Sequence, residues 1–182
     1  MKAIAAMDLN RVIGNKGKIP WKISDEFQWF KQKTINDVIV MGRTTFDSIG
    51  CLPGRFTYVL TSNPNKLSTH EQSILARENK DGLHHCYIQG KDLIEWCQKW
   101  PERTNYFWLC GGAKIYQQFL PYCSEVYQSI ILDEYEGDTF MPEYEHDFPN
   151  SELIMEHKKF WVVRYWKPGD PFLQAGKIKF VI

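Results

Sequence analysis

Short apolar segments alternate with helical patterns along most of this chain, and this alternation limits the folds open to it. The apolar segments are Ala3–Met7, Val38–Met41, Tyr58–Leu60, Cys86–Ile88, Tyr106–Cys110 and Val126–Leu132. Helical patterns lie between several of them, over Asp25–Thr34, Thr44–Ile49, Asp92–Trp100 and Ala113–Leu120. Strands that are apolar throughout are typical of parallel sheets covered by helices on both faces. The sequence therefore predicts an α/β fold with a mainly parallel sheet flanked by helices.

The pattern changes after Asp138. Ser151–Tyr165 and Lys177–Ile182 alternate polar and apolar residues, and the turn sequence Pro168-Gly169-Asp170-Pro171 separates them. We expect these two segments to pair as a C-terminal antiparallel hairpin at the edge of the sheet. The chain shows no internal repeat, low-complexity segment or linker, so we expect a single domain over residues 1–182.

The composition excludes several classes of function. A chain of 182 residues with 43% hydrophobic residues can bury a substantial core, and its 22 basic and 22 acidic residues leave no excess charge for nucleic acid. No segment has the character of a signal peptide or a membrane span. Five cysteines without a CxxC pair favour free thiols in a reducing compartment. We expect a cytoplasmic protein that binds neither nucleic acid nor membranes.

We also expect no metal site. The segment His84-His85-Cys86 looks like a metal-binding cluster at first sight. Neighbouring residues on a strand point to opposite faces, so these three side chains are poorly placed to share an ion.

One carboxylate stands out because of its apolar neighbours. In the segment Pro20–Phe30, Ser24 would cap a helix, and Asp25 and Glu26 would occupy its first turn. Helical spacing places Glu26 on the same face as Phe30. A carboxylate on an apolar wall should have a raised pKa and should bind a flat heterocycle with adjacent N–H and NH2 groups. Most acidic residues in a first turn only complement the helix dipole, and Asp25, which points elsewhere, is interpreted in that way.

Three loops follow strands at the edge of a parallel sheet where ligands bind. The first, Asp8–Ile23, is long and punctuated by glycines, as in a lid. The second, Met41–Phe46, and the third, Cys110–Tyr116, each lead from a strand through glycine into a helix. One such turn is usually only a tight connection. Two of them opposite a buried carboxylate predict a cofactor with several phosphates across the sheet edge.

Together these segments resemble the dihydrofolate reductase family. The resemblance is carried, in the family's order and spacing, by Ile4-Ala5-Ala6, Val12-Ile13-Gly14, Pro20-Trp21, Glu26 with Trp29-Phe30-Lys31, Val40 to Phe46, Leu52-Pro53-Gly54-Arg55, Gly111-Gly112 with Ile115-Tyr116, Phe119-Leu120-Pro121 and Glu136-Gly137-Asp138-Thr139. It weakens past Met141. It implies an oxidoreductase of one-carbon metabolism and tetrahydrofolate biosynthesis, and a target of antifolates. In the implied reaction a hydride passes from NADPH to C6 of the pterin of dihydrofolate while N5 takes a proton.

The resemblance also implies roles for individual residues. Glu26 would bind N3 and the 2-amino group of the pterin and promote protonation at N5, Trp21 would hold an ordered water, and Ser129 would bridge to Glu26. The other substrate contacts would be Ile4, Phe30, Ile49, Arg55 and Cys110, with Arg55 on the α-carboxylate of the glutamyl tail. The contacts to NADPH would be Ala6, Ile13, Gly42, Arg43, Thr44, Thr45, Thr61, Ser62, Gly111, Gly112, Ala113, Lys114, Ile115 and Tyr116. Arg43, Thr61 and Ser62 would surround the 2′-phosphate. The family resemblance further implies a cis peptide between Gly111 and Gly112, and we expect a monomer.

Two alternatives remain open from the sequence. A pyrimidinone reductase of riboflavin synthesis shares the fold but lacks the Pro-Trp lid and the acidic residue at the position of Glu26. A catalytically idle folate- or nucleotide-binding module would not require Glu26, Trp21, Arg55 and both glycine turns to be intact. Loss of NADPH absorbance on addition of dihydrofolate distinguishes these alternatives.

Overall fold

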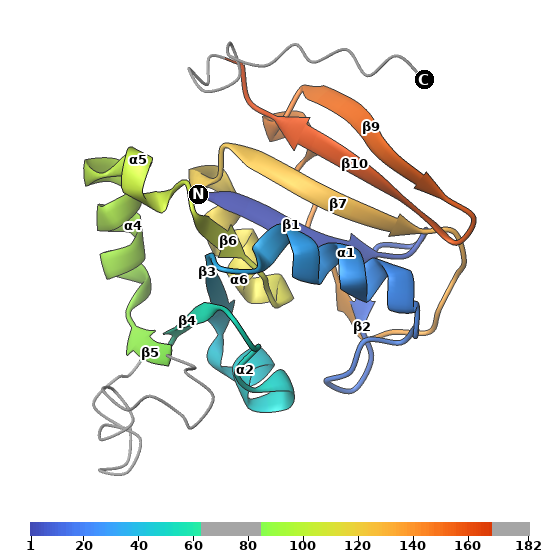
Figure 1. Ribbon diagram of the computed structural model, residues 1–182, viewed down its shortest axis with the longest axis horizontal. Coiled ribbons are helices and arrows are strands. Elements are labelled where there is room, and N and C mark those ends of the chain that lie inside the picture. The colour runs from blue at the N-terminus through green and yellow to red at the C-terminus, as the bar shows by residue number, and fades with distance from the viewer. Residues whose placement is uncertain (63–84, 169–182) are drawn as a thin grey trace.

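An eight-stranded sheet forms the centre of the protein, in the order β5-β4-β3-β6-β1-β7-β10-β9 (Figure 1). The computed structural model describes residues 1–62 and 85–168. The strands of this sheet are β1 (Lys2–Met7), β3 (Val38–Gly42), β4 (Phe56–Leu60), β5 (His85–Ile88), β6 (Phe107–Leu109), β7 (Glu125–Ile131), β9 (Asn150–His157) and β10 (Phe160–Trp166). The pairs from β5 to β7 are parallel, and β10 is antiparallel to both β7 and β9. This confirms the predicted α/β fold with a mainly parallel sheet.

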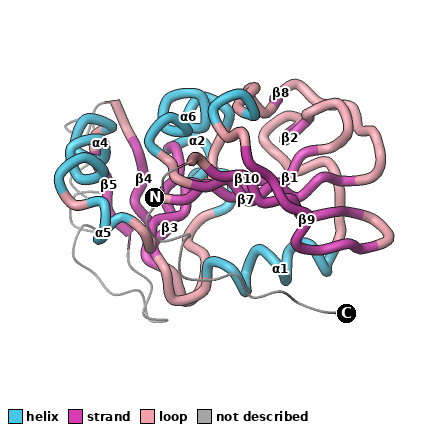
Figure 2. The backbone as a smooth tube through the Cα atoms, turned by 90° about the horizontal axis from the view of Figure 1, so that it is seen from above, coloured by secondary structure: helices cyan, strands magenta, loops and turns pink. Residues whose placement is uncertain are grey.

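Helices lie on both sides of the sheet. Helix α1 covers one face, and α6 lies on the opposite side (Figure 2). The helices are α1 (Ser24–Thr34), α2 (Arg43–Ile49), α4 (Gly90–Lys99), α5 (Pro101–Thr104) and α6 (Ala113–Phe119), with short 3-10 turns η3 (Leu120–Tyr122) and η4 (Glu145–Asp147). The four predicted helices all occur, each within about two residues of its expected ends. No helix in the described part of the chain has the length and apolar character that crossing a membrane requires.

Helix α1 begins one residue earlier than the sequence indicates. Its N-cap is Ile23, in an extended conformation, and no side chain caps the helix. The predicted capping role of Ser24 is therefore wrong. Both Trp21 and Ile23 are buried in the apolar cluster under α1, so packing of the preceding segment sets the start of the helix in place of a local hydrogen bond.

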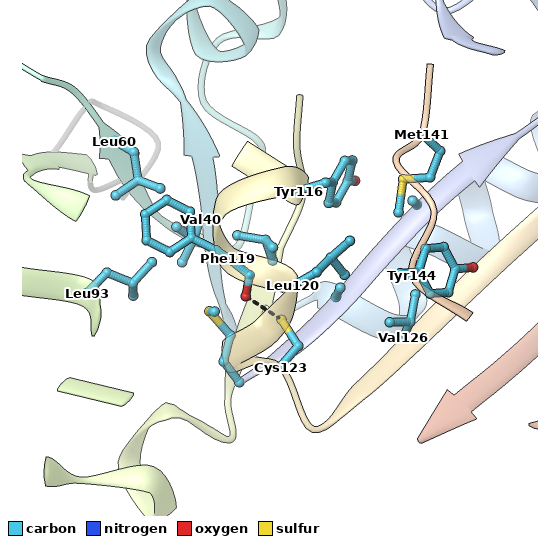
Figure 3. Close-up of a cluster of buried hydrophobic side chains, with 14 of the residues drawn as sticks. Val40, Leu60, Leu93, Tyr116, Phe119, Leu120, Cys123, Val126, Met141 and Tyr144 are labelled. Atoms are coloured by element: carbon cyan, nitrogen blue, oxygen red, sulfur yellow. Dashed lines mark hydrogen bonds between the residues drawn. The ribbon is translucent and has the colours of Figure 1, made fainter. Parts of the chain in front are cut away.

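Two apolar clusters fill the two faces of the sheet. Figure 3 shows part of the one beneath α4 and α6, formed by Val40, Leu60, Leu93, Tyr116, Phe119, Leu120, Cys123, Val126, Met141 and Tyr144 among others. The Cys123 thiol donates a hydrogen bond to the Phe119 carbonyl at 3.5 Å there, as a buried small residue. The cluster beneath α1 includes Ile4, Trp21, Trp29, Ile39, Met41, Trp108 and Phe160. Strands β1 and β3 contribute to both clusters, which explains their nearly continuous apolar sequences.

The C-terminal hairpin is present, but its turn is not where the sequence indicated. Strands β9 and β10 together span the segment predicted as one strand, Ser151–Tyr165, with one residue more at each end, and they pair antiparallel across Lys158-Lys159. The single-strand prediction is therefore wrong, because this turn contains no glycine or proline to mark it. Pairing of β10 with β7, from Phe160 opposite Ile131 to Trp166 opposite Glu125, sets its position instead. Residues 169–171 of the predicted turn and the predicted strand Lys177–Ile182 lie outside the described residues.

A second, two-stranded sheet joins two loops that are far apart in the sequence. Strand β2 (Val12–Gly14), just after β1, pairs antiparallel with β8 (Thr139–Phe140), after β7. Gly137 lies directly against β2. A Cβ added there would be 2.2 Å from Val12 Cγ1 and 2.7 Å from the Gly14 carbonyl oxygen. Only glycine allows this close approach of the two backbones.

An ion pair holds the hairpin to the parallel part of the sheet. Arg164 Nε on β10 lies 2.6 Å from Glu125 Oε2 on β7, and the two side chains are 20% and 13% exposed. The substitution Arg164→Met keeps an apolar stem of similar length but leaves the Glu125 carboxylate largely buried without its partner. We expect the free energy of unfolding, measured by urea denaturation, to fall by about 1–3 kcal/mol.

Lys99→Met is the matched control for this prediction. It breaks an ion pair with Glu95 on the surface of α4, where the two side chains are 61% and 53% exposed. Exposed pairs contribute little to stability, so the change should be small. Equal effects of the two substitutions would show that the Arg164–Glu125 pair does not hold the hairpin in place.

Candidate active site

A cleft of about 1580 Å³ opens at the carboxyl ends of the parallel strands. A single small ligand typically occupies about 300–1,000 Å³, so this cleft has room for two. Every predicted site residue lines it except Ser129, which was predicted to reach the site through Glu26. These residues are Ile4, Ala6, Ile13, Trp21, Glu26, Phe30, Gly42, Arg43, Thr44, Thr45, Ile49, Arg55, Thr61, Ser62, Cys110, Gly111, Gly112, Ala113, Lys114, Ile115 and Tyr116.

Glu26 faces the cleft from the first turn of α1 and is only 5% exposed. Ser129, on β7, donates a hydrogen bond from Oγ to Glu26 Oε1 at 2.9 Å. Burial raises the pKa of Glu26, and the Ser129 hydrogen bond opposes this in part. The direction predicted from the apolar neighbours is confirmed. Asp25, by contrast, is 65% exposed and lies 3.4 Å from His157 Nε2, outside the cleft.

Trp21 forms part of the wall near Glu26. Its side chain is 2% exposed, and its ring packs against Tyr135 with 5.5 Å between centroids. Among the described residues its buried indole Nε1–H has no hydrogen-bond acceptor. A buried donor without an acceptor is costly, so this N–H is suited to a polar group held in the cleft.

Arg55 supplies a buried positive charge to the cleft. The residue is 7% exposed, and its guanidinium donates to the Pro53 carbonyl at 3.2 Å and to Thr34 Oγ1 at 3.1 Å. Its central carbon lies 5.8 Å from the Phe30 ring centroid. No carboxylate pairs with it among the residues that the structure describes. A guanidinium bonded only to neutral acceptors keeps its charge and its remaining donors for an anionic ligand.

The two glycine turns pack directly against each other. The peptide bond between Gly111 and Gly112 is cis, as predicted. Gly111 has a φ of +97°, and a Cβ added there would lie 2.9 Å from Tyr116 Cε2. Gly42 donates its N–H to the Gly111 carbonyl at 2.8 Å, and a Cβ at that position would lie 2.8 Å from Ile115 Cγ1. These glycines bring two strand ends and two helix starts together in one wall of the cleft, which we call the glycine wall.

Tyr116 and Cys110 contribute neutral groups to the inner wall. The Tyr116 hydroxyl donates to the Ile4 carbonyl at 2.7 Å, which holds the backbone of β1 at the cleft. Burial raises the pKa of both the Tyr116 hydroxyl and the Cys110 thiol well above the usual range, so both stay protonated. The Cys110 thiol donates to the Trp108 carbonyl at 3.3 Å and is therefore a packing group here, without the thiolate character of a nucleophile.

Arg43 lies at the other glycine turn, where α2 begins. Its Nε lies 3.0 and 3.1 Å from the two carboxylate oxygens of Asp47, one helical turn along. Its guanidinium lies over the Tyr87 ring, 5.3 Å from the centroid. Asp47 was not predicted as a partner, although the i,i+4 spacing is visible in the sequence. Two contacts thus orient Arg43 on the cleft wall.

Several cleft residues were missed by the sequence analysis, among them Lys18, Lys31, Leu52, Gly90, Gln118 and Asp138. Gly90 starts α4 shortly after β5, so the strand-to-helix glycine signal that identified Gly42 and Gly112 also applies to it. Asp138 lies in a recognised motif. Its Oδ2 accepts the Lys16 N–H at 3.0 Å, which attaches the lid loop to the segment before β8. Residues 1–62 and 85–168 contain no group of three or more His, Cys, Asp or Glu side chains placed to hold a metal ion.

The burial of Glu26 should be visible as a pH-dependent cost in stability. The folded pKa of this carboxyl is raised, so the cost is absent below the unfolded pKa, grows as the pH rises between the two pKa values and stays constant above the folded one. Glu26→Gln removes the ionisation. We expect the melting temperature of the variant to increase relative to that of the wild type as the pH rises from about 4, near the ordinary carboxyl pKa, to about 8.

The size of this gain in melting temperature measures the difference between the pKa of Glu26 in the folded protein and its pKa in the unfolded chain. A tenfold difference in proton affinity corresponds to about 1.4 kcal/mol, or about 3–6 °C in a chain of this length. Thermal melts of both proteins across the pH range make the measurement. A melting-temperature difference that does not change with pH would mean that Glu26 is not buried at a desolvating site.

Comparisons with a family model, with individual relatives and with a solved structure all match the same family. The family model "Dihydrofolate reductase" matches residues 1–159. The chain is 31% identical to the dihydrofolate reductase of Enterococcus faecium over 155 residues, covering 84% of this chain and 83% of that protein. It is 35% identical to that of Bacillus subtilis over 154 residues, covering 83% and 79%. A solved structure of dihydrofolate reductase from Enterococcus faecalis, complexed with NADP(H) and RAB-propyl, matches with a TM-score of 0.67, 28% identity and coverage of 92% of this chain and 95% of that one.

Proposed function

The chain belongs to the dihydrofolate reductase family, and we propose that the cleft around Glu26 binds dihydrofolate beside NADPH. Its reaction is the NADPH-dependent reduction of dihydrofolate to tetrahydrofolate. The observation that supports this site most directly is one buried carboxylate of raised pKa, facing a cleft with room for two ligands. A pterin presents the adjacent N–H and NH2 groups that such a carboxylate can bind.

Two groups of the protein orient the substrate. Glu26 binds N3 and the 2-amino group of the pterin, and Arg55 binds the α-carboxylate of the glutamyl tail. Arg55 suits this role because it is buried and bonded only to neutral acceptors among the described residues. Phe30 and Ile49 contact the rings between these two anchors, and Ile4 and Cys110 contact the far edge of the pterin. Fixing both ends of the substrate places C6 and N5 reproducibly.

The proton for N5 is delivered under the control of Glu26 and Trp21. The raised pKa of Glu26 brings its proton affinity closer to neutral pH, which favours general acid catalysis. Ser129 holds the carboxylate in place through its hydrogen bond to Oε1. The buried Nε1–H of Trp21 holds an ordered water beside the pterin, which gives this donor its acceptor.

The glycine wall and its neighbours hold the cofactor, and the residues present fit it. NADPH, when bound, supplies the hydride that reduces C6. The backbones of Ala6 and Ile13 hold the nicotinamide carboxamide. The glycine turns let backbone N–H groups approach the pyrophosphate together with Thr44, Thr45 and the segment Ala113–Tyr116. Arg43, Thr61 and Ser62 surround the 2′-phosphate.

No observation favours a pyrimidinone reductase or an idle binding module. Glu26 and Trp21, which the pyrimidinone reductases lack, line the cleft together with Arg55. We also propose that residues 1–182 form one domain, and that the protein acts as a cytoplasmic monomer on small molecules, without nucleic acid or membrane partners.

Glu26→Gln tests the assignment of the ionisable group. Removing one member of a buried, charged interaction typically costs about 2–5 kcal/mol, or roughly thirty- to several-thousand-fold in rate. We expect the variant to bind NADPH normally and to lose about a hundredfold or more in turnover near neutral pH. Turnover is followed by the loss of NADPH absorbance on addition of dihydrofolate.

Asp25→Asn is the matched control, because Asp25 is the neighbouring carboxylate and lies outside the cleft. It should turn over at close to the wild-type rate. If the two variants behaved alike, Glu26 would not be the group that assists protonation.

The choice of cofactor tests the proposed 2′-phosphate site. A charge-assisted hydrogen bond to phosphate contributes about 1.5–3 kcal/mol, so NADPH should exceed NADH by about tenfold or more in kcat/KM. Arg43→Ala should remove most of this ratio by weakening NADPH alone. Lys31→Ala, which removes a different cation from the lining of the cleft, should leave the ratio unchanged. Equal use of the two cofactors by the wild type would disprove the site.

A further inference from the structure

Asp8 is a buried carboxylate that the proposed reaction does not use. It follows β1 directly and is 1% exposed. Its Oδ1 accepts the backbone N–H groups of Asn10 at 2.9 Å and Val12 at 2.8 Å, and its Oδ2 accepts the N–H of Tyr135 at 2.7 Å. Hydrogen bonds from N–H groups to a carboxylate are among the strongest in proteins. These three short bonds therefore fix the backbone at Asn10, Val12 and Tyr135.

The carboxylate joins two loops that are distant in the sequence. On one side it closes the turn between β1 and β2, in which the Asp8 N–H also donates to the Val12 carbonyl at 3.1 Å and the Asp8 carbonyl accepts the Arg11 N–H at 3.1 Å. On the other side it holds Tyr135, which lies 127 positions away in the loop between β7 and β8. Asp8 therefore ties the base of the lid to the segment that precedes β8.

Both connected segments lead directly to the active site. Val12 precedes Ile13, a residue of the cleft wall. Tyr135 packs its ring on Trp21 at 5.5 Å, with an interplanar angle of 57°. Trp21 lines the cleft, and its buried Nε1 has no acceptor among the described residues. Asp8 and Tyr135 do not line the cleft themselves. Ile13 and Trp21 are therefore the cleft residues through which Asp8 and Tyr135 reach the reaction.

We propose that Asp8 is a positioning residue for dihydrofolate reduction. Through Tyr135 it holds the indole of Trp21, and through Val12 it holds the backbone of Ile13, in the arrangement that the reaction needs. This inference rests on the proposed roles of Trp21 and Ile13. It means that the reaction also requires a residue outside the cleft, because the Asp8 carboxylate positions two parts of the cleft wall, Trp21 and Ile13.

Asp8→Asn isolates this role because it keeps the size and shape of the side chain. An asparagine has one acceptor oxygen, so in either orientation of its amide at least one of the three backbone N–H groups faces another donor. We expect the rate of NADPH oxidation in a single turnover to fall by about ten- to a hundredfold. The KM for dihydrofolate should change by less than about threefold, because the Glu26 and Arg55 anchors are intact.

Tyr135 provides a second test that does not depend on Asp8→Asn folding. Tyr135→Leu removes the ring on Trp21 and leaves the Asp8 hydrogen bond in place, so it should lower the single-turnover rate in the same way. Tyr135→Phe keeps the ring and should be close to wild type. In both Asp8→Asn and Tyr135→Leu the NMR resonance of the Trp21 indole N–H, assigned with Trp21→Phe, should shift.

Asp37→Asn is the matched structural control. Asp37 Oδ2 accepts the Trp108 indole N–H at 2.7 Å, and Asp37 does not line the cleft. It should lower the melting temperature while leaving the rate per folded molecule unchanged. Single-turnover rates of Asp8→Asn and Tyr135→Leu equal to that of Asp37→Asn would overturn the inference. A wild-type protein without turnover would instead overturn the proposed function on which the inference rests.

Discussion

The parallel pairing of β1 with a strand on each side is the constraint on which the active site depends. β1 lies between β6 and β7, with Ala6 opposite Ser129. This register puts the Ser129 hydroxyl under α1, where it meets Glu26. Because side chains alternate along a strand, a shift of one residue would bring Gln128 or Ile130 to that position instead. The Ser129 hydroxyl would then no longer meet the carboxylate.

The same arrangement places the apolar clusters directly behind the cleft. The clusters lie on the two faces of the sheet, and some of their residues, including Ile4, Trp21 and Tyr116, also line the cleft at the carboxyl ends of the strands. Glu26, Arg55 and the Trp21 N–H are all buried in ways that cost folding free energy, and the clusters offset that cost. Buried polar groups without full hydrogen-bonding partners lower the stability of the fold, and these three gain partners when a ligand binds. This is the usual conflict between an active site and maximal stability.

The lid loop is attached at its base and exposed at its tip. At the base, Asp8 accepts the N–H of Tyr135 in the loop between β7 and β8, and Arg11 lies 2.7 Å from Glu145 at the start of η4. One further hydrogen bond, from the Lys16 N–H to Asp138, reaches the start of the tip. At the tip, residues 16–19 are exposed. Firm attachment close to the proposed pterin and nicotinamide sites, with an exposed tip further out, suits a lid that must admit a cofactor without disturbing the reacting rings.

The sequence by itself determined most elements and the character of Glu26, because both depend on neighbours along the chain. Apolar runs and helical spacing predicted the parallel strands and four helices, and the apolar residues around Glu26 predicted its raised pKa. The order of motifs indicated which residues line the cleft. Only the tertiary structure decided the turn at Lys158-Lys159, the start of α1 and the bond from Asp8 to Tyr135. Each of these depends on contacts between segments far apart in the chain, and such contacts leave no periodic or local signal in the sequence.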